Sequence, residues 1–227
     1  MTAYFAPIRD MQFVINELAD LSKVAALPTF AEQEVGPELL EAVLEEAAKL
    51  ATEVLAPINK SGDVQGVRID PTGVVSAAGF TEAYRSFIDG GWNGIGSPVT
   101  HGGQGLPELF NTATQEMWNS ANMSFALCPM LNAGAIEAIS RAGSAEQRAL
   151  YLPKMVSGEW TGTMNLTEPQ AGSDLSAVRT RAVPHGDHYR IFGQKIFITW
   201  GDHDMTENTI HLVLARTPDA PEGVKGI

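Results

Sequence analysis

The sequence predicts an α+β protein, in which an all-α helical bundle comes first and a truncated antiparallel β-domain follows. Two observations carry this prediction. Apolar residues recur at helical spacing in several segments up to about residue 157, and β-branched and aromatic residues concentrate after residue 159. No internal repeat interrupts this order. We therefore expect an N-terminal arm at 1–34, a helical domain at 35–158 and an incomplete β-domain at 159–227.

The helical part divides into recognisable segments. The arm mixes aromatic, acidic and small residues around one short helix, and apolar residues at helical spacing over 37–58 then predict a long amphipathic helix. Pro37 suits its first turn. A second helix over 80–88 ends at Gly90-Gly91, because glycine readily adopts the left-handed conformation that stops helices.

A loop and three further helical stretches complete this part. Residues 94–107 are too rich in Gly and Pro to be regular, so we expect a surface or site loop there. Helical spacing returns at 109–117 and again at 131–139. Ser144 followed by Gln147 has the spacing of a capping box and predicts the start of another helix. Up to about residue 157 the sequence predicts helices alone.

Three segments of the second half read as strands. Residues 160–167 are rich in β-branched and aromatic residues. Residues 189–199 predict two strands around a turn at Gly193, and residues 209–215 predict a further strand that ends before Pro218. A sheet that begins this close to the end of the sequence has few strands, so we expect it to have an exposed edge.

Composition excludes several classes of protein. With 44% hydrophobic and 19% charged residues in 227, the chain can bury a core, which excludes a disordered chain. The net charge of −12 predicts no nucleic-acid partner, because phosphates would repel most of its faces. Charge, Gly or Pro breaks every long apolar stretch, so we expect no membrane span. The single cysteine, Cys128, favours a cytoplasmic protein.

Residues 166–174 are the most unusual local feature. A predicted strand runs there into a tight turn with small residues, hydroxyls and open backbone N–H groups, an arrangement that can bind a phosphate or the edge of a flavin-like ring. The alternative is a surface turn of the Asx type, closed by a hydrogen bond to the side chain of Asp174. Neither a P-loop nor a dinucleotide-binding βαβ motif is present in the sequence.

Three motifs in order carry a resemblance to a known family. The residues T-E-P-Q-A-G-S-D at 167–174 resemble the T-E-P-x-A-G-S-D signature of flavin-dependent acyl-CoA dehydrogenases. Residues 151–160 resemble the stretch that precedes this signature, and G-Q-K-I-F-I-T at 193–199 resembles the N-G-Q-K-x-W-I-T segment. Weaker similarity reaches back to Leu39. The motifs F-A-P at 5–7 and H-D-M-T at 203–206 resemble a longer-chain branch that includes methylthiopropanoyl-CoA dehydrogenases.

The resemblance implies FAD as cofactor and assigns roles to individual residues. Thr167 would bond the pyrimidine end of the flavin, and Gly172 and Ser173 would lie near the pyrophosphate. Ser173 would also be close to the CoA substrate. On the other side, Phe197 would pack on the isoalloxazine and Thr199 would approach N5. The remaining implied cofactor-binding residues are Met164, Leu166 and Ile198.

The resemblance also implies a reaction. It is the FAD-dependent α,β-dehydrogenation of an acyl-CoA to the trans-2-enoyl-CoA in fatty acid metabolism, with electrons passed to an electron-transfer flavoprotein. A homo-oligomer, dimer or tetramer, is implied as well. The glutamate base and the second helical domain are expected beyond Ile227, so we expect the chain alone to be inactive. Two alternatives stay open: an acyl-CoA oxidase, and a non-catalytic module that binds acyl-CoA or a protein.

The sequence departs from the family pattern at two positions. Asn165 stands where most relatives have a small residue or cysteine, and Phe197 stands where they have tryptophan. The phenyl ring keeps the stacking surface but lacks the indole N–H. We expect the neighbouring Trp200 to substitute for it in part.

Other candidate sites have simpler interpretations. We expect residues 202–204 to form a solvated turn rather than a metal site, and Cys128 to be inert packing. Glu168 is expected to shape the turn rather than act as base. The acidic stretch at 32–46 fits a solvated helix face as well as a docking face, and His101 is left unassigned.

Overall fold

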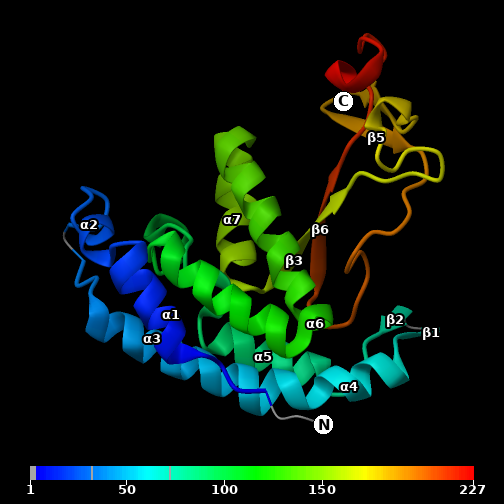
Figure 1. Cartoon of the computed structure of the whole chain (residues 1–227). Helices are drawn as coiled ribbons and strands as arrows, with labels where there is room; N and C mark the ends of the chain where they lie inside the picture. Colours follow the sequence, from blue (N-terminus) through cyan, green and yellow to red (C-terminus); the bar gives the residue numbers. More distant parts are fainter. Residues whose placement is uncertain (1–3, 32, 72) are drawn as a thin grey trace.

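The structure, a computed structural model, describes residues 4–31, 33–71 and 73–227. Helices α1 to α5 and the first part of α6 form the larger body of the molecule (Figure 1). From this body the later part of α6, helix α7 and the strand pair β3–β6 rise side by side, and the hairpin β4–β5 lies with the C-terminus at the far end of the strands. The second half of the chain therefore projects from a helical base.

The N-terminal arm is helical and contributes to the core. It contains α1 (Ile8–Phe13), the π-helical turn η1 (Val14–Leu18) and α2 (Leu21–Ala25), where one short helix was expected. Met11, Ile15 and Leu21 are buried, and α1 packs against α3. Residues 1–3 and Glu32 of the expected arm lie outside the described residues.

The long amphipathic helix is confirmed and begins at Pro37. It consists of α3 (Pro37–Lys49), the π-helical segment η2 (Leu50–Leu55) and α4 (Ala56–Gln65), which follow one another without a break. Its buried face repeats every three or four residues, as an amphipathic helix requires. That face comprises Leu40, Leu44, Ala47, Ala51 and Leu55. The acidic residues of the expected 32–46 stretch that are described lie within or just before α3.

A small hairpin follows where helices alone were expected. Strands β1 (Arg68–Asp70) and β2 (Gly73–Val75) pair antiparallel, with Arg68 opposite Val75. Strands this short leave too few residues for a recognisable period-two pattern, so the prediction missed them. Helix α5 (Phe80–Asp89) then runs as expected, and Gly91 has the left-handed φ of 73° at its end.

The Gly- and Pro-rich segment is irregular apart from two single turns of 3₁₀-helix. These are η3 (Trp92–Gly94) and η4 (Val99–His101). The backbone folds back on itself, because Gln104 N donates to Gly94 O at 2.9 Å and Leu106 N to Ile95 O at 3.0 Å. The expected loop is confirmed.

Helix α6 (Glu108–Ala142) joins the two later helical stretches across a kink. Asn122 has non-helical angles, φ −157° and ψ 87°. Its Oδ1 accepts from Phe125 N at 3.1 Å, in the manner of an N-cap, while its Nδ2 donates to Leu55 O at 3.1 Å. The side chain is fully buried, so it starts a new helix inside the core and ties that start to η2.

Helix α6 is unusually apolar, and its packing explains why. By length and composition alone, this helix could cross a membrane. No such segment was expected from the sequence. In the structure α6 packs against α3, α4, α7 and β3. Its apolar side chains supply much of the core of the helical part.

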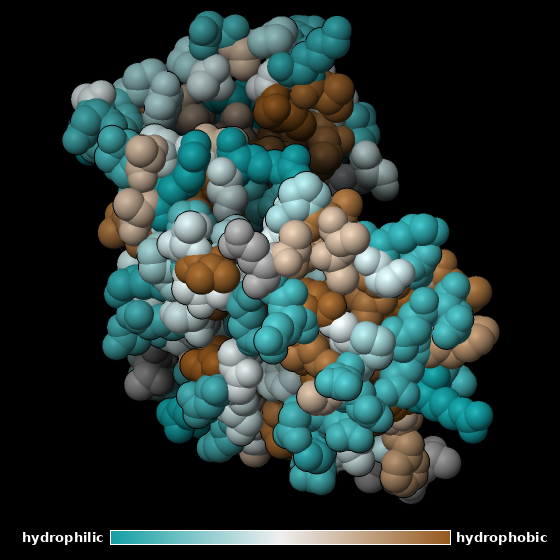
Figure 2. Space-filling model, turned by 90° about the vertical axis from the view of Figure 1, so that its left-hand side faces the viewer, coloured by the Kyte–Doolittle hydropathy of each residue, from teal (hydrophilic) through white to brown (hydrophobic). Residues whose placement is uncertain are grey.

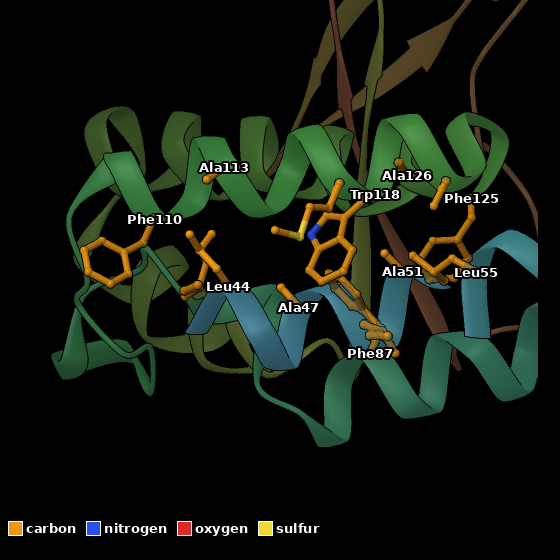
Figure 3. Close-up of a cluster of buried hydrophobic side chains, with 14 of the residues drawn as sticks. Leu44, Ala47, Ala51, Leu55, Phe87, Phe110, Ala113, Trp118, Phe125 and Ala126 are labelled. Carbon is orange, nitrogen blue, oxygen red and sulfur yellow. The ribbon is translucent and has the colours of Figure 1, made fainter. Parts of the chain in front are cut away.

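Aromatic side chains fill the centre of that core. Phe87 of α5 lies between α3–η2 and α6, facing Trp118 and Phe125 (Figure 3). Both ring pairs are T-shaped, with centroids 5.7 Å and 5.8 Å apart. Edge-to-face packing of this kind stabilises beyond simple burial. The core therefore fixes the position of α6 relative to the earlier helices.

Helix α7 (Ala145–Ser157) begins with the predicted capping box. Ser144 Oγ accepts from Gln147 N at 3.2 Å, and Gln147 Oε1 accepts from Ser144 N at 2.8 Å. Leu152 and Met155 of α7 are fully buried against Ala135 of α6 in a second hydrophobic cluster. This cluster supports the strand that follows.

The α+β class is confirmed, but one strand pair runs opposite to the expectation. Strand β3 (Trp160–Asn165) pairs with β6 (Asn208–Val213) in parallel, with Trp160 opposite Asn208. An antiparallel β-domain was expected. Residues 166–207 separate the two strands, and this connection is long enough to cross over, as a parallel pair requires. Sequence pattern reports strands but not their relative direction.

The predicted strand pair over 189–199 is wrong in its second member. Strand β5 (His188–Phe192) pairs antiparallel with β4 (Arg181–His185), around a turn at Gly186, whose φ is 67°. Residues 194–199 instead continue as irregular chain. Beyond Gly193 the backbone leaves the hairpin.

The hairpin is exposed on both faces. Its uncovered apolar side chains are Val183, Tyr189, Ile191 and Phe192. Figure 2 shows apolar residues gathered on the upper part of the molecule, beyond a narrower waist. Two further 3₁₀ turns, η5 (Leu175–Ala177) and η6 (Gly223–Gly226), lie at this end of the fold.

Candidate functional site

The two motifs at 167–174 and 193–199 lie side by side. Ile196 N donates to Thr167 O at 3.0 Å, and Lys195 Nζ donates to Leu166 O at 2.9 Å. The backbone N–H of Ile196 and the side chain of Lys195 are thereby bonded to the first motif and not to β5. They explain why the predicted second strand does not form after Gly193.

Glu168 is the centre of this contact. Its carboxylate is 3% exposed and accepts from Lys195 Nζ at 2.9 Å. It also accepts from Thr180 N at 3.0 Å, Arg179 N at 2.8 Å and Gln170 Nε2 at 2.5 Å. Burial acts to raise the pKa of Glu168, but the hydrogen bonds from Thr180, Arg179 and Lys195 outweigh it and hold this pKa well below the ordinary range.

A carboxylate with these partners is a poor proton acceptor, because protonation would break charge-assisted bonds. It instead holds three backbone segments together, in agreement with the expected turn-shaping role of Glu168. Its own backbone closes the turn, since Glu168 N donates to Ala171 O at 2.9 Å and Ala171 N donates to Glu168 O at 3.0 Å.

The tip of the turn is open. Gly172 and Ser173 are exposed, and a Cβ at Gly172 would meet no described atom within 4 Å. Asp174 Oδ1 accepts from Ser176 N at 2.9 Å, which is the hydrogen bond of the surface-turn interpretation. The turn is therefore locally closed by Asp174, yet it leaves room for a group beside Gly172 and Ser173.

Arg216 holds the far end of the turn. Its guanidinium donates to Ser176 O at 2.7 Å and Val178 O at 2.8 Å, and on the other side to Gly223 O at 2.9 Å. One planar side chain thus joins η5 and η6 through main-chain carbonyls. The fork geometry of arginine suits such multiple donation.

Phe197 projects from the second motif. Its side chain is 87% exposed and its φ is 55°, a left-handed conformation that is unusual for an aromatic residue. Ile198 is half-buried and Thr199 is exposed. The second motif therefore exposes an aromatic residue and, two positions later, a hydroxyl-bearing residue.

Trp200 does not supply an indole to the same place. Its Nε1 donates to Ser124 O of α6 at 2.9 Å. Its ring lies 6.0 Å from the ring of Phe80 and forms part of the wall of a cavity of about 840 Å³. Since its N–H is bonded to the helical body, the structure disagrees with the expectation that Trp200 substitutes for the missing tryptophan at 197.

The other predicted site residues lie at the end of β3. Met164 and Leu166 are half-buried. Asn165, the unusual residue between them, has its Oδ1 2.6 Å from Thr163 Oγ1, which is itself 2.7 Å from His211 Nδ1 of β6. Asn165 therefore completes a polar row across the parallel strand pair, where a smaller residue could not reach Thr163.

The prediction of a solvated turn at 202–204 is wrong for His203, which is buried. Its Nε2 lies 3.0 Å from Thr161 Oγ1 and its Nδ1 accepts from Met205 N at 3.2 Å. Burial lowers the pKa of His203, although the two flanking aspartates act against it. Asp204 accepts from Ser76 N at 3.0 Å and so ties this loop to the small hairpin.

No group of three or more metal-ligating side chains occurs among the described residues. Cys128 is buried, and burial raises the pKa of its thiol well above the ordinary value, so an inert packing role fits its surroundings. His101 lies in the 3₁₀ turn η4, away from the two motifs in the chain.

Three residues that position the site were not singled out from the sequence. Lys195 stood inside a matched motif but carried no predicted role, and Thr180 and Arg216 had no local signal at all. Each contacts residues that are distant in sequence. Thr180 does so with its backbone N–H, and Arg216 donates from its side chain to main-chain carbonyls. Such contacts leave no period or motif in the chain.

The comparisons with known proteins agree with these motifs. Residues 37–159 match the model of the acyl-CoA dehydrogenase N-terminal domain. Over 225 residues the chain is 52% identical to 3-methylmercaptopropionyl-CoA dehydrogenase of Ruegeria pomeroyi, covering 99% of this chain and 38% of that protein. It is 38% identical to a butyryl-CoA dehydrogenase of Syntrophomonas wolfei, covering 99% of this chain and 37% of the relative.

A solved structure shares the fold. The butyryl-CoA dehydrogenase of Megasphaera elsdenii matches with a TM-score of 0.67 at 25% identity, over 83% of this chain and 46% of that chain. The chain thus spans less than half of the length of each of these proteins. The family match covers more than half of the chain, so the chain belongs to the acyl-CoA dehydrogenase family.

Proposed function

We propose that this chain provides the helical base and one flavin-binding edge of an FAD-dependent acyl-CoA dehydrogenase, which oxidises an acyl-CoA thioester to its trans-2-enoyl product. The observation that carries the proposal is the buried Glu168–Lys195 contact. It brings Thr167 beside the segment that exposes Phe197 and Thr199. These are the residues to which the family resemblance assigns cofactor contacts.

The residues present fit a flavin. A flat conjugated ring needs an apolar surface, donors to its polar edge and neutral donors to its phosphates. Phe197 offers an uncovered ring and Thr199 an exposed hydroxyl. Gly172 and Ser173 offer an open turn where a Cβ at Gly172 would meet no described neighbour. When bound, FAD supplies an acceptor for the hydride, and with it the two electrons, that leaves the substrate.

We assign the following work to the chain's own residues. Thr167 and Thr199 donate hydrogen bonds to the polar edge of the ring system. Phe197 covers the ring and excludes water from it. Ser173 donates to phosphate oxygens and lies near the CoA moiety. Met164, Leu166 and Ile198 supply the remaining apolar contacts, and Glu168 holds the turn without taking a proton.

The substrate class is an acyl-CoA. Support comes from the relatives, whose names include 3-methylmercaptopropionyl-CoA and butyryl-CoA dehydrogenases, and from the family motifs. The 52% identity favours a short acyl chain with a thioether as the first candidate. Transfer of electrons to an electron-transfer flavoprotein, homo-oligomerisation and a cytoplasmic location complete the proposal, and each rests on the resemblance or the composition.

The test is a spectrum of the protein purified from its complete gene. We expect a flavin absorption band, and we expect anaerobic addition of 3-methylmercaptopropionyl-CoA or butyryl-CoA to bleach it while a product lighter by two hydrogens forms. A colourless protein that takes up no FAD would contradict the proposal. A band that bleaches and then recovers rapidly in air, with formation of hydrogen peroxide, would indicate an oxidase instead.

A further inference from the structure

The segment 197–200 has a backbone that its own sequence does not favour. Phe197 and Trp200 both have left-handed angles, with φ of 55° and 53°. For residues with a Cβ this conformation crowds the following carbonyl, and bulky aromatic residues adopt it rarely. Two such residues within four positions persist only when surrounding contacts hold them.

Contacts hold the segment at both ends. On the N-terminal side, Ile196 N is bonded to Thr167 O and Lys195 Nζ to Glu168 Oε1. On the C-terminal side, Gly201 N donates to Ile198 O at 3.1 Å and closes a turn. Beyond this local turn, the side chain of Trp200 is the anchor: its Nε1 donates to Ser124 O at 2.9 Å.

The anchor point lies beside the kink of helix α6. Ser124 comes two residues after the kink of α6, where Asn122 caps the second half of the helix through Phe125 N at 3.1 Å. The ring of Trp200 is half-buried; its centroid lies 6.0 Å from the ring of Phe80 and 5.6 Å from that of His203, the latter in a T-shaped arrangement. The indole is thus held by a hydrogen bond and by two rings from different elements.

Between these two attachments lie the residues that face outward. Phe197 is 87% exposed and Thr199 is exposed, and neither has a side-chain hydrogen bond or ring contact described that would fix it independently. Their direction is therefore set by the backbone on which they sit. A side chain that fixes this backbone also fixes where the phenyl ring and the hydroxyl point.

We propose that Trp200 is a positioning residue for the cofactor site: by donating its indole N–H to Ser124 O, it holds the left-handed segment that presents Phe197 and Thr199. The proposal rests on the proposed flavin-binding function. It also makes the kink of α6 part of the site, because this kink places the accepting carbonyl. Trp200 itself touches neither cofactor nor substrate in this role.

The test compares Trp200→Phe, which keeps a ring but removes the N–H, with Trp92→Phe as matched control. Trp92 packs edge-to-face on Trp118, with centroids 5.4 Å apart, in the helical body. Amide hydrogen exchange is measured on both variants without added FAD. We expect exchange at Gly201 and its neighbours in 197–201 to rise roughly 3- to 10-fold in Trp200→Phe, the effect of one neutral hydrogen bond.

Two internal references sharpen this measurement. The amide of Ile196, bonded to Thr167 O, should keep its protection in Trp200→Phe. Trp92→Phe should leave 197–201 unchanged even if it lowers overall stability. Unchanged exchange across 197–201 in Trp200→Phe would overturn the proposal, whatever the protein does with FAD.

A second measurement concerns the cofactor. In the protein purified from its complete gene, Trp200→Phe should weaken FAD binding roughly 3- to 10-fold and alter the visible flavin spectrum, whereas Trp92→Phe should change neither. A loosened segment with unaltered FAD affinity and spectrum would overturn the positioning role. A wild-type protein that binds no FAD would contradict the proposed function, and the exchange result would still decide whether Trp200 holds the segment.

Discussion

The ammonium of Lys195 lies 2.9 Å from Oε1 of Glu168, and both side chains are nearly buried, at 10% and 3% exposed. Lys195 also donates to Leu166 O at 2.9 Å. One side chain from the second motif therefore satisfies both the backbone and the acidic residue of the first. This contact joins the two family motifs.

Lys195→Met should destabilise the protein strongly. Removing one partner of a buried ion pair leaves an uncompensated charge, which costs about 3–5 kcal/mol. Urea denaturation followed by circular dichroism measures the loss. Lys49→Met is the matched control, since Lys49 pairs with Glu46 on the surface and both side chains are largely exposed. That control should change stability by less than about 1 kcal/mol. Equal effects of the two variants would refute a structural role for the buried pair.

The lowered pKa of Glu168 predicts a loss of stability in acid. Because the folded-state pKa lies below that of the unfolded chain, about 4.3, the contribution is fully present above pH 4.3 and is lost as pH falls below it. Urea midpoints measured between pH 7 and pH 3 should fall more steeply for wild type than for Glu168→Gln. Parallel profiles for the two proteins would contradict this prediction.

His203 predicts a separate effect at higher pH. Burial lowers its folded-state pKa below the unfolded value of about 6.5, so the folded protein resists protonation of this ring more than the unfolded chain does. Stability should therefore be complete above pH 6.5 and decline as pH falls toward 5. In His203→Asn the decline over this window should be smaller, whatever its stability at pH 7. The control is His101→Asn, which replaces a histidine in the 3₁₀ turn η4 and should leave the decline as in wild type.

Gly193 should not tolerate alanine. A Cβ there would lie 2.8 Å from the Cα of Thr180, a main-chain atom that cannot move aside easily. We expect Gly193→Ala to cost about 1–3 kcal/mol, as overpacking does. Gly172→Ala, with no described atom within 4 Å of the new Cβ, should stay within about 0.5 kcal/mol of wild type. Thermal unfolding of the two variants side by side tests the contrast.

Phe197→Ala should separate binding from stability. The side chain is 87% exposed, so its loss should change the unfolding free energy by less than about 0.5 kcal/mol. If the ring packs on the flavin, FAD affinity should fall roughly tenfold or more, as the loss of an aromatic contact and its buried area implies. Titration of flavin fluorescence measures this. Unchanged affinity would remove Phe197 from the cofactor site.

Much of the helical part could be predicted from the sequence, because its information is local. Pro37 at a first helical turn, the Ser144–Gln147 capping box and the stop at Gly91 each act within one turn of helix. The hairpin β1–β2 escaped because three-residue strands carry almost no periodic signal.

The strands after residue 159 show the opposite case. The composition of 189–199 indicated extended chain, but Gly193 cannot by itself say whether the backbone turns back into a hairpin or leaves it. Lys195 and Ile196 find their partners at Leu166, Thr167 and Glu168, almost thirty positions earlier, and these bonds redirect the segment. The parallel direction of β3 and β6 is likewise a property of the crossover and not of either strand.

The sequence by itself determined the α+β class, the order of the helices and the residues of the two motifs, since these depend on periodicity, capping and short motifs along the chain. Only the tertiary structure decided that Glu168 is a buried hub, that Trp200 points to Ser124 instead of toward Phe197, and that His203 is buried. The physical reason is that burial and hydrogen-bond partners arise from segments far apart in the chain, which no local pattern records.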